Sequence, residues 1–169
     1  ENEESRKSTV SLFNSLPPQI LVVDEFEDEA SIISDWIKQQ VRVGTPASEI
    51  GIFVRSESEL SRAKSAIIDA GQDAFKITDK FEVNNNAIAY GTMHLAKGLE
   101  FRSVAVIACD EDVLPQQDRL ERVTDASDLA EVYETERHLL YVACTRAREH
   151  LLVTGVAPGS EFLEDLDCR

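Results

Sequence analysis

Cysteine is scarce in this 169-residue sequence, and its positions do not suit cross-linking or metal binding. The three cysteines, Cys109, Cys144 and Cys168, are far apart, and none has a histidine at the spacing of a metal ligand. An odd number of widely separated cysteines predicts neither a disulfide framework nor a zinc or iron–sulfur site. We therefore expect no metal site, and a protein of the reducing cytoplasm.

Positive charge and long hydrophobic runs are also lacking. The sequence has 17 lysines and arginines against 32 aspartates and glutamates, which gives a formal net charge of -15. This charge repels a phosphate backbone at long range, so any contact with DNA must be local and made by few groups. A highly soluble surface accounts for most of the acidity. No apolar run approaches the roughly 20 residues of a membrane-spanning helix, and we expect no membrane partner.

A phosphate-binding loop of the form G-x-x-x-x-G-K-[ST] is missing, and no glycine occurs before Gly44. An apolar strand that ends in Asp24 and Glu25 has the form of a magnesium-binding strand, but such a site needs the phosphate loop upstream of it. The dipole of an amphipathic helix favours acidic residues in its first turn without any metal. We therefore expect these carboxylates to be structural.

What the sequence does contain is an alternation of apolar strands and amphipathic helices, of a length that suits one domain. Residues 1–18 are polar, end in Pro17 and Pro18, and are expected to be a linker ahead of a domain over residues 19–169. The pattern predicts an α/β fold with a mostly parallel sheet and helices on both faces. We expect strands at residues 20–23, 50–54, 75–77, 88–91, 104–109 and 150–154, and helices at 25–41, 56–70, 126–148 and after Gly159.

One polar segment, residues 89–101, concentrates groups that bind ligands. A hydroxyl, an imidazole, an ammonium group, a bare glycine and a carboxylate follow an apolar run, at Thr92, His94, Lys97, Gly98 and Glu100. Open α/β sheets place ligand contacts in such loops at the carboxyl ends of strands. The segment is therefore the first candidate for a functional site.

Three segments resemble motifs of the UvrD/Rep group of superfamily 1 DNA helicases. Residues 91–101, with Thr92-x-His94-x-x-Lys97-Gly98-Leu99-Glu100-Phe101, resemble motif V, and residues 134–148, with Thr145-Arg146-Ala147, resemble motif VI. Residues 50–71 resemble the motif IV region. The resemblance implies the second, C-terminal RecA-like motor domain of such a helicase. Because only residues 72–87 lie between the motif IV region and motif V, the resemblance implies a compact form without a large insertion.

The resemblance also implies a role for each of six residues. Gly98, Glu100 and Arg146 would contact ATP, and Arg146 would be the catalytic arginine finger. A planar guanidinium suits two-point contact with phosphate. By the same resemblance, Arg55, Thr92 and His94 would contact single-stranded DNA.

The residues alone leave other interpretations open. Arg146 and Arg148 stand near the end of the helix expected at 126–148, where cations complement the helix dipole, and for Arg148 we prefer this interpretation. Arg146 is expected on the inward stripe of that helix. Arg55 is equally consistent with a surface residue at a strand end, and Lys97 is assigned to neither ligand.

The implied function is ATP-driven translocation of a DNA helicase on single-stranded DNA. An N-terminal RecA-like domain of the same protein would supply the phosphate loop and hold most of the Mg²⁺ coordination. A helicase fused to a nuclease and a non-catalytic, acidic interaction module are the alternatives. Because the phosphate loop is missing, we expect the 169-residue chain alone to hydrolyse no ATP; robust phosphate release by the purified chain would contradict this interpretation.

Overall fold

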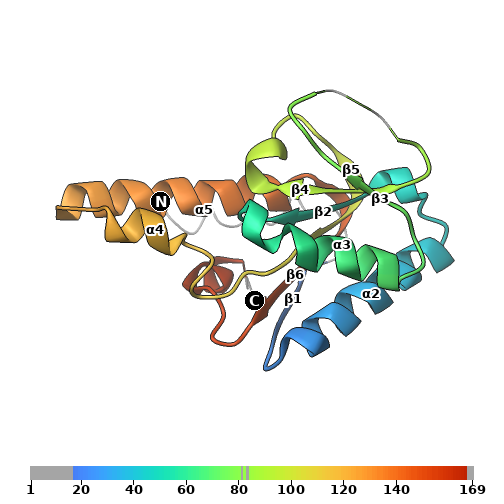
Figure 1. Cartoon of the computed structure of the whole chain (residues 1–169), viewed down its shortest axis with the longest axis horizontal. Coiled ribbons are helices and arrows are strands. Elements are labelled where there is room, and N and C mark those ends of the chain that lie inside the picture. Colours follow the sequence, from blue (N-terminus) through green and yellow to red (C-terminus); the bar gives the residue numbers. More distant parts are fainter. Residues whose placement is uncertain (1–16, 81, 83, 167–169) are drawn as a thin grey trace.

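The computed structural model describes residues 17–80, 82 and 84–166 of the 169-residue chain. The linker expected over residues 1–18 lies almost wholly outside these residues. The described part forms one six-stranded sheet with helices on both faces, as Figure 1 shows. The α/β fold predicted from the sequence is confirmed.

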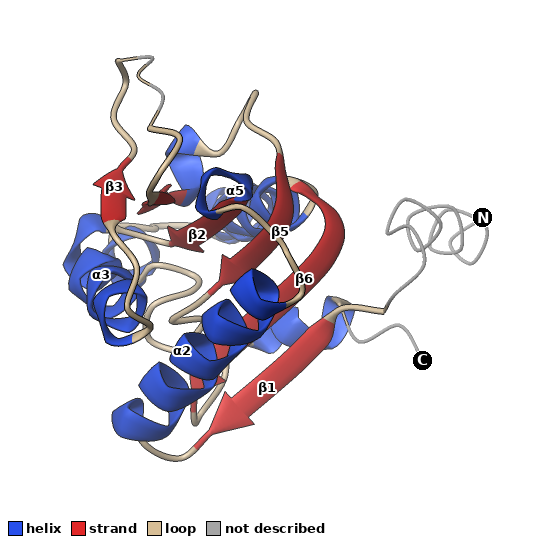
Figure 2. Cartoon of the chain, turned by 90° about the vertical axis from the view of Figure 1, so that its right-hand side faces the viewer, coloured by secondary structure: helices blue, strands red, loops and turns tan. Residues whose placement is uncertain are grey.

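The strands lie in the order β1-β6-β5-β2-β4-β3, and the pairings between them are parallel. Figure 2 shows β1 and β3 at the two edges of the sheet. Parallel strands need long crossover connections, and α-helices supply those from β1 to β2, from β2 to β3 and from β5 to β6. The strands are β1 (Gln19–Val23), β2 (Ile50–Val54), β3 (Ala74–Lys76), β4 (Ile88–Thr92), β5 (Phe101–Val106) and β6 (Ala147–Val156).

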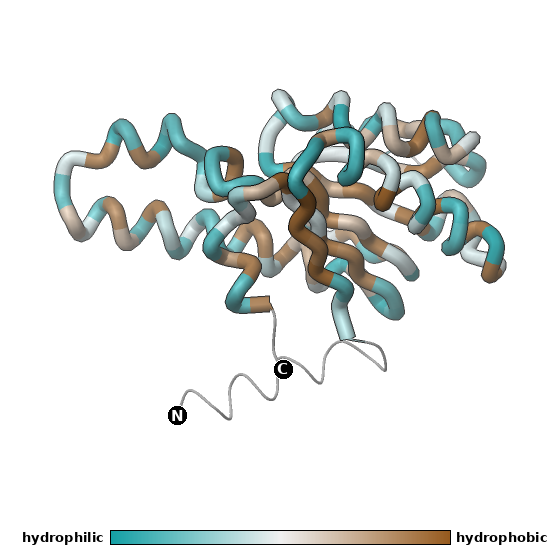
Figure 3. Tube along the Cα trace, turned by 90° about the horizontal axis from the view of Figure 1, so that it is seen from below, coloured by the Kyte–Doolittle hydropathy of each residue, from teal (hydrophilic) through white to brown (hydrophobic). Residues whose placement is uncertain are grey.

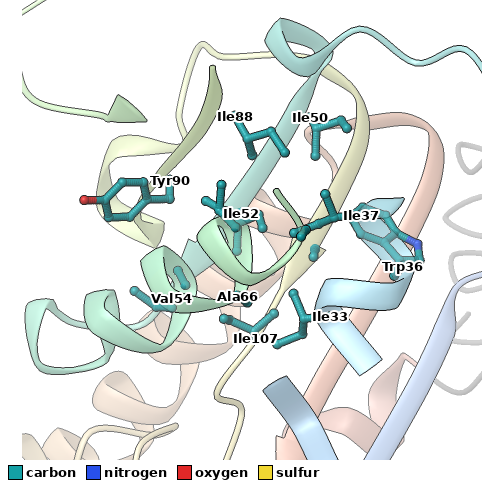
Figure 4. Close-up of a cluster of buried hydrophobic side chains, with 14 of the residues drawn as sticks. Ile33, Trp36, Ile37, Ile50, Ile52, Val54, Ala66, Ile88, Tyr90 and Ile107 are labelled. Atoms are coloured by element: carbon teal, nitrogen blue, oxygen red, sulfur yellow. The ribbon is translucent and has the colours of Figure 1, made fainter. Parts of the chain in front are cut away.

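The helices divide between the two faces and bury two separate cores. Helices α2 (Phe26–Arg42) and α3 (Leu60–Asp69) cover one face, and α5 (Ala126–Cys144) covers the other. Successive side chains of a strand point to opposite faces, so Ile52 and Val54 of β2 meet α2 and α3 while Phe53 meets α5. Figure 4 shows the first core, in which Ile33 and Ile37 of α2 point toward the strands.

The first half of α5 projects beyond the sheet. Residues 126–135 bury no side chain, and burial along the helix begins at Glu136. A short helix that the sequence analysis missed, α4 (Gln117–Glu121), packs beside this half. We call residues 117–135 the helical arm; it extends to the left in Figure 1, and its mixed hydropathy in Figure 3 contrasts with the hydrophobic central strands.

Two sequence-based expectations need correction. The apolar residues 20–23 predict a buried strand, but β1 is an edge strand in which Leu21 and Val22 are 42% and 47% exposed. Helix α5 ends at Cys144 rather than at Arg148, and β6 begins at once because Ala147 pairs with Phe101 of β5. Arg146 therefore lies in the turn between α5 and β6 and not on a helical stripe.

The close approach of β2 and β5 generates a prediction. A Cβ atom at Gly51 would lie 2.8 Å from Cδ2 of the Phe101 ring. Overpacking of this kind costs about 1–3 kcal/mol, so Gly51→Ala should lower the free energy of unfolding in urea by that amount. The double variant with Phe101→Leu should lose less than the sum of the single losses. Wild-type stability in Gly51→Ala would contradict the packing.

Candidate functional site

The loop after β4, residues 93–100, runs from the carboxyl ends of the parallel strands to their amino ends. We call these two sides of the sheet the carboxyl edge and the amino edge. Thr92 ends β4 and Phe101 begins β5, and both strands run parallel to β2. The end of one parallel strand and the start of another lie at opposite edges, which for ordinary strands are about 17–20 Å apart. The residues singled out by the sequence therefore form two groups. The amino-edge group is Gly98, Glu100 and Arg146, and the carboxyl-edge group is Arg55, Thr92 and His94.

Arg146 joins the loop to the end of α5. Its Nε donates to the carbonyl of Val142 at 3.1 Å, and its Nη1 donates to the carbonyl of Leu99 at 3.3 Å. Its Nη2 donates to Thr145 Oγ1 at 3.2 Å. These acceptors are uncharged, and the salt bridges found within the described residues do not include Arg146. The half-buried guanidinium is thus held in place while its charge is left without a carboxylate partner.

Gly98 and Glu100 are exposed beside Arg146. Gly98 has a φ of 82°, a left-handed conformation that a residue with a Cβ adopts only at a cost, and a Cβ there would touch nothing within 4 Å. Glu100 follows Leu99, whose carbonyl binds Arg146. The amino-edge group therefore offers a fixed cation, a carboxylate and an open stretch of backbone at one place on the surface.

At the carboxyl edge, Arg55 and Glu136 form a buried ion pair. Arg55 is 3% exposed and Glu136 is 0% exposed. Nε of Arg55 donates to Oε2 at 2.6 Å, and Nη2 donates to Oε1 at 2.5 Å. Burial by itself would raise the pKa of Glu136, but hydrogen bonding and charge from Arg55, with a hydrogen bond from Arg119, hold that pKa below its usual value.

Arg55, for which the resemblance implies a DNA contact, is buried rather than exposed in this structure. Its guanidinium is enclosed, and the hydrogen bonds that Nε and Nη2 donate to Glu136 would have to break before a phosphate could bind at those donors. Glu136 was not singled out from the sequence, although a signal was present. It stands four and seven residues before Leu140 and Ala143, and all three are buried on one side of α5.

His94 and Thr92 lie next to this ion pair and remain accessible. His94 is exposed in the turn that follows β4, and Thr92 is half-buried opposite Val54 of β2. Partial burial and the positive charges of Arg55 and Arg119 lower the pKa of His94, although Glu136 acts in the opposite direction. These effects together favour the neutral form of the His94 imidazole, which binds by hydrogen bonds rather than by charge.

A second ion-pair network, which the sequence analysis also missed, lies between α2, α3 and the segment after β5. Arg62 binds Glu29 at 2.6 Å and Asp110 at 2.7 Å. Asp110 also accepts a hydrogen bond from the amide of Val156 at 2.7 Å. A hollow of about 280 Å³ between α2 and α3 is lined in part by Arg62 and Glu29 and by none of the sequence-predicted site residues. We interpret this network as structural support.

The described residues contain neither a cluster suited to a metal ion nor a helix long and apolar enough to cross a membrane.

Comparisons with known proteins agree on one family. The profile described as UvrD-like helicase C-terminal domain matches residues 71–157. The chain is 37% identical over 139 residues to the ATP-dependent DNA helicase UvrD1 of Mycobacterium leprae, covering 82% of this chain and 17% of the relative. It is 28% identical over 123 residues to the putative ATP-dependent DNA helicase YjcD of Bacillus subtilis, covering 72% and 16%. The chain thus spans about one sixth of the length of these relatives.

A solved structure has the same fold. It is the C-terminal domain of a possible DNA helicase from Lactobacillus plantarum WCFS1, with a TM-score of 0.68 and 21% identity over 96% of this chain and 88% of the other.

The buried ion pair at the carboxyl edge generates a prediction. Glu136→Gln leaves Arg55 charged and buried, and losing one partner of such a pair costs about 3–5 kcal/mol. The variant should therefore unfold at a lower urea concentration at pH 7, whereas Glu134→Gln, on the exposed side of α5, should not. Because the pKa of Glu136 is lowered in the folded protein, its contribution is complete above the unfolded pKa of about 4.3. It should fade as the pH falls below that value, and a stability gap that persisted unchanged in acid would contradict this account.

Proposed function

The chain belongs to the family of UvrD-like helicase C-terminal domains, and from this we propose that it is the second motor domain of an ATP-dependent DNA helicase that translocates on single-stranded DNA. The observation that carries the proposal is the position of Arg146. Its guanidinium is fixed by three uncharged acceptors beside Glu100 and has no carboxylate partner among the described residues. A preorganised cation of this kind suits the negative charge that develops on a phosphoryl group during transfer.

ATP would bind between this domain and an N-terminal RecA-like domain of the same protein. Gly98, Glu100 and Arg146 are the groups on this side, and their exposure and free charge fit a nucleotide presented by a facing surface. ATP supplies the phosphoryl group, and Mg²⁺ would be held mainly by the other domain, because this chain lacks the phosphate loop. Arg146 would bind and orient the terminal phosphate and stabilise its charge in the transition state.

Single-stranded DNA would lie at the carboxyl edge, against the Thr92 hydroxyl and the His94 imidazole. A neutral imidazole and a hydroxyl position a phosphate by hydrogen bonds without reading sequence. Arg55 is not part of this proposed contact, because its guanidinium is paired with Glu136.

Two elements would couple the nucleotide to the DNA. The loop at residues 93–100 carries His94 at one edge and Glu100 at the other, and the end of α5 connects the same two places. Glu136 and Cys144, the last residue of α5, are eight residues apart, about 12 Å along the helix axis, and Arg146 follows in the next turn. A displacement of Arg146 toward a phosphate would therefore be passed along a packed helix to the groups around His94.

The two alternatives remain less well supported. A degenerate interaction module has no need of an unpaired, positioned Arg146 beside Glu100. A fusion with a nuclease concerns residues beyond this chain, and no residue of the domain favours it.

Arg146→Ala, made in the longer helicase chain that carries this domain, should lower DNA-stimulated ATP hydrolysis by about a thousandfold or more, because the arginine finger is lost. Binding of an oligo-dT strand, measured by fluorescence anisotropy, should stay near the wild-type value. The matched control is Arg148→Ala, an exposed arginine paired with Glu49, which should leave both properties unchanged. Equal loss of hydrolysis and DNA binding, or of neither, would remove Arg146 from its proposed role. If wild-type protein showed neither ATP hydrolysis nor DNA binding, the proposed function itself would fail.

A further inference from the structure

The charged groups that act on His94 carry more positive than negative charge, on a strongly acidic chain. The charged groups that act on His94 are Arg55, Arg119 and Glu136. Two arginines and one glutamate leave a net charge of +1 at this place, against -15 for the whole sequence. We call these three residues with His94 the carboxyl-edge cluster.

The two arginines of the cluster are not equivalent. Arg55 meets Glu136 through two nitrogens at 2.5 and 2.6 Å and is 3% exposed. Arg119 meets the same carboxylate through Nη1 alone, at 3.0 Å, and its side chain is 35% exposed. The carboxylate is therefore used chiefly by the buried arginine, and the excess charge resides on the accessible one.

Arg119 is also held in place by contacts that do not use all of its guanidinium hydrogen-bond donors. It stands on α4, where its amide donates to the carbonyl of Gln116 at 3.1 Å. The Gln116 side chain in turn accepts a hydrogen bond from Arg55 at 3.2 Å. In the described part of the chain, Nε and Nη2 of Arg119 donate no hydrogen bond to another residue. A guanidinium anchored at one corner and open at the others is well suited to phosphate.

We propose that Arg119 is a further contact for the phosphate backbone of single-stranded DNA, acting beside Thr92 and His94. This inference rests on the proposed function and extends its DNA site from the loop after β4 to the base of the helical arm. Glu136 is the positioning residue: it neutralises Arg55 and orients Arg119 through one oxygen. Arg119 would bring a positive charge to the phosphate backbone, which the neutral His94 does not. The contact is also local, as expected for an acidic chain that repels DNA at long range.

The test compares Arg119→Ala, Arg119→Lys and His94→Ala in the longer helicase chain, with Arg122→Ala as a matched control. Arg122 is an exposed arginine at the end of the same short helix and outside the cluster. Binding of a fluorescent oligo-dT strand is measured at several NaCl concentrations. Each phosphate contact on a single strand contributes about 0.7 to the slope of log K against log salt. Arg119→Ala should weaken binding and flatten this slope by about that amount.

The other variants separate a DNA contact from a structural role. Arg119→Lys should keep the wild-type slope, and Arg122→Ala should match wild type throughout. His94→Ala should weaken binding with little change of slope, because the imidazole is uncharged. Arg119→Ala should lower the melting temperature less than Glu136→Gln does, since Arg55 still neutralises Glu136.

Three results would overturn the inference. An unchanged slope in Arg119→Ala, with weaker binding in His94→Ala, would reject Arg119 while leaving the proposed DNA site intact. Equal losses in Arg119→Ala and Arg119→Lys, together with a melting temperature as low as that of Glu136→Gln, would assign Arg119 to structure alone. No binding of oligo-dT by the wild-type protein would reject the proposed function, and this inference with it.

Discussion

The buried pair of Arg55 and Glu136 is the contact on which the arrangement of the domain depends. It joins the end of β2 to the middle of α5, across 81 positions of sequence. Removing two charges from water costs several kcal/mol per ion, which is repaid only by good geometry and further hydrogen bonds. Gln116 and Arg119 supply those bonds. An arrangement that separated Arg55 from Glu136 would leave buried charge without a partner. The pair therefore fixes the position of α5 on the sheet.

With α5 fixed at Glu136, the rest of the site follows from the connectivity of a parallel sheet. The helix must return to the amino edge to begin β6, so the turn that carries Arg146 comes to lie where β5 starts. The loop at residues 93–100 also runs from the carboxyl edge to the amino edge, between β4 and β5. Two separate segments thus bring polar groups to the same two edges, and each edge receives one contribution from the loop and one from α5.

The sequence predicted what depends on neighbours along the chain and missed what depends on distant partners. Residues 50–54 were assigned correctly because an apolar run between polar turns is a local signal. The burial of Arg55 was not foreseen, since nothing near it indicates Glu136. Helix α5 ends before the predicted residue 148 because Ala147 pairs with Phe101, and the helical spacing of the sequence does not reveal that pairing. Of the candidate site, the loop was predicted from its polar residues and Arg146 from the family motif, whereas the supporting cluster required the structure.

Glu136 also divides α5 into an exposed first part and a second part that packs against the sheet. Before it the helix has no buried side chain and is supported by α4 and by the cap at Asp125, which accepts a hydrogen bond from the amide of Asp128. After it, Leu140, Ala143 and Cys144 are packed in the core. A closely packed helix transmits a displacement, because its neighbours leave it little room to bend. The packed half therefore links the two edges of the site, while the acidic arm extends from it as an exposed surface.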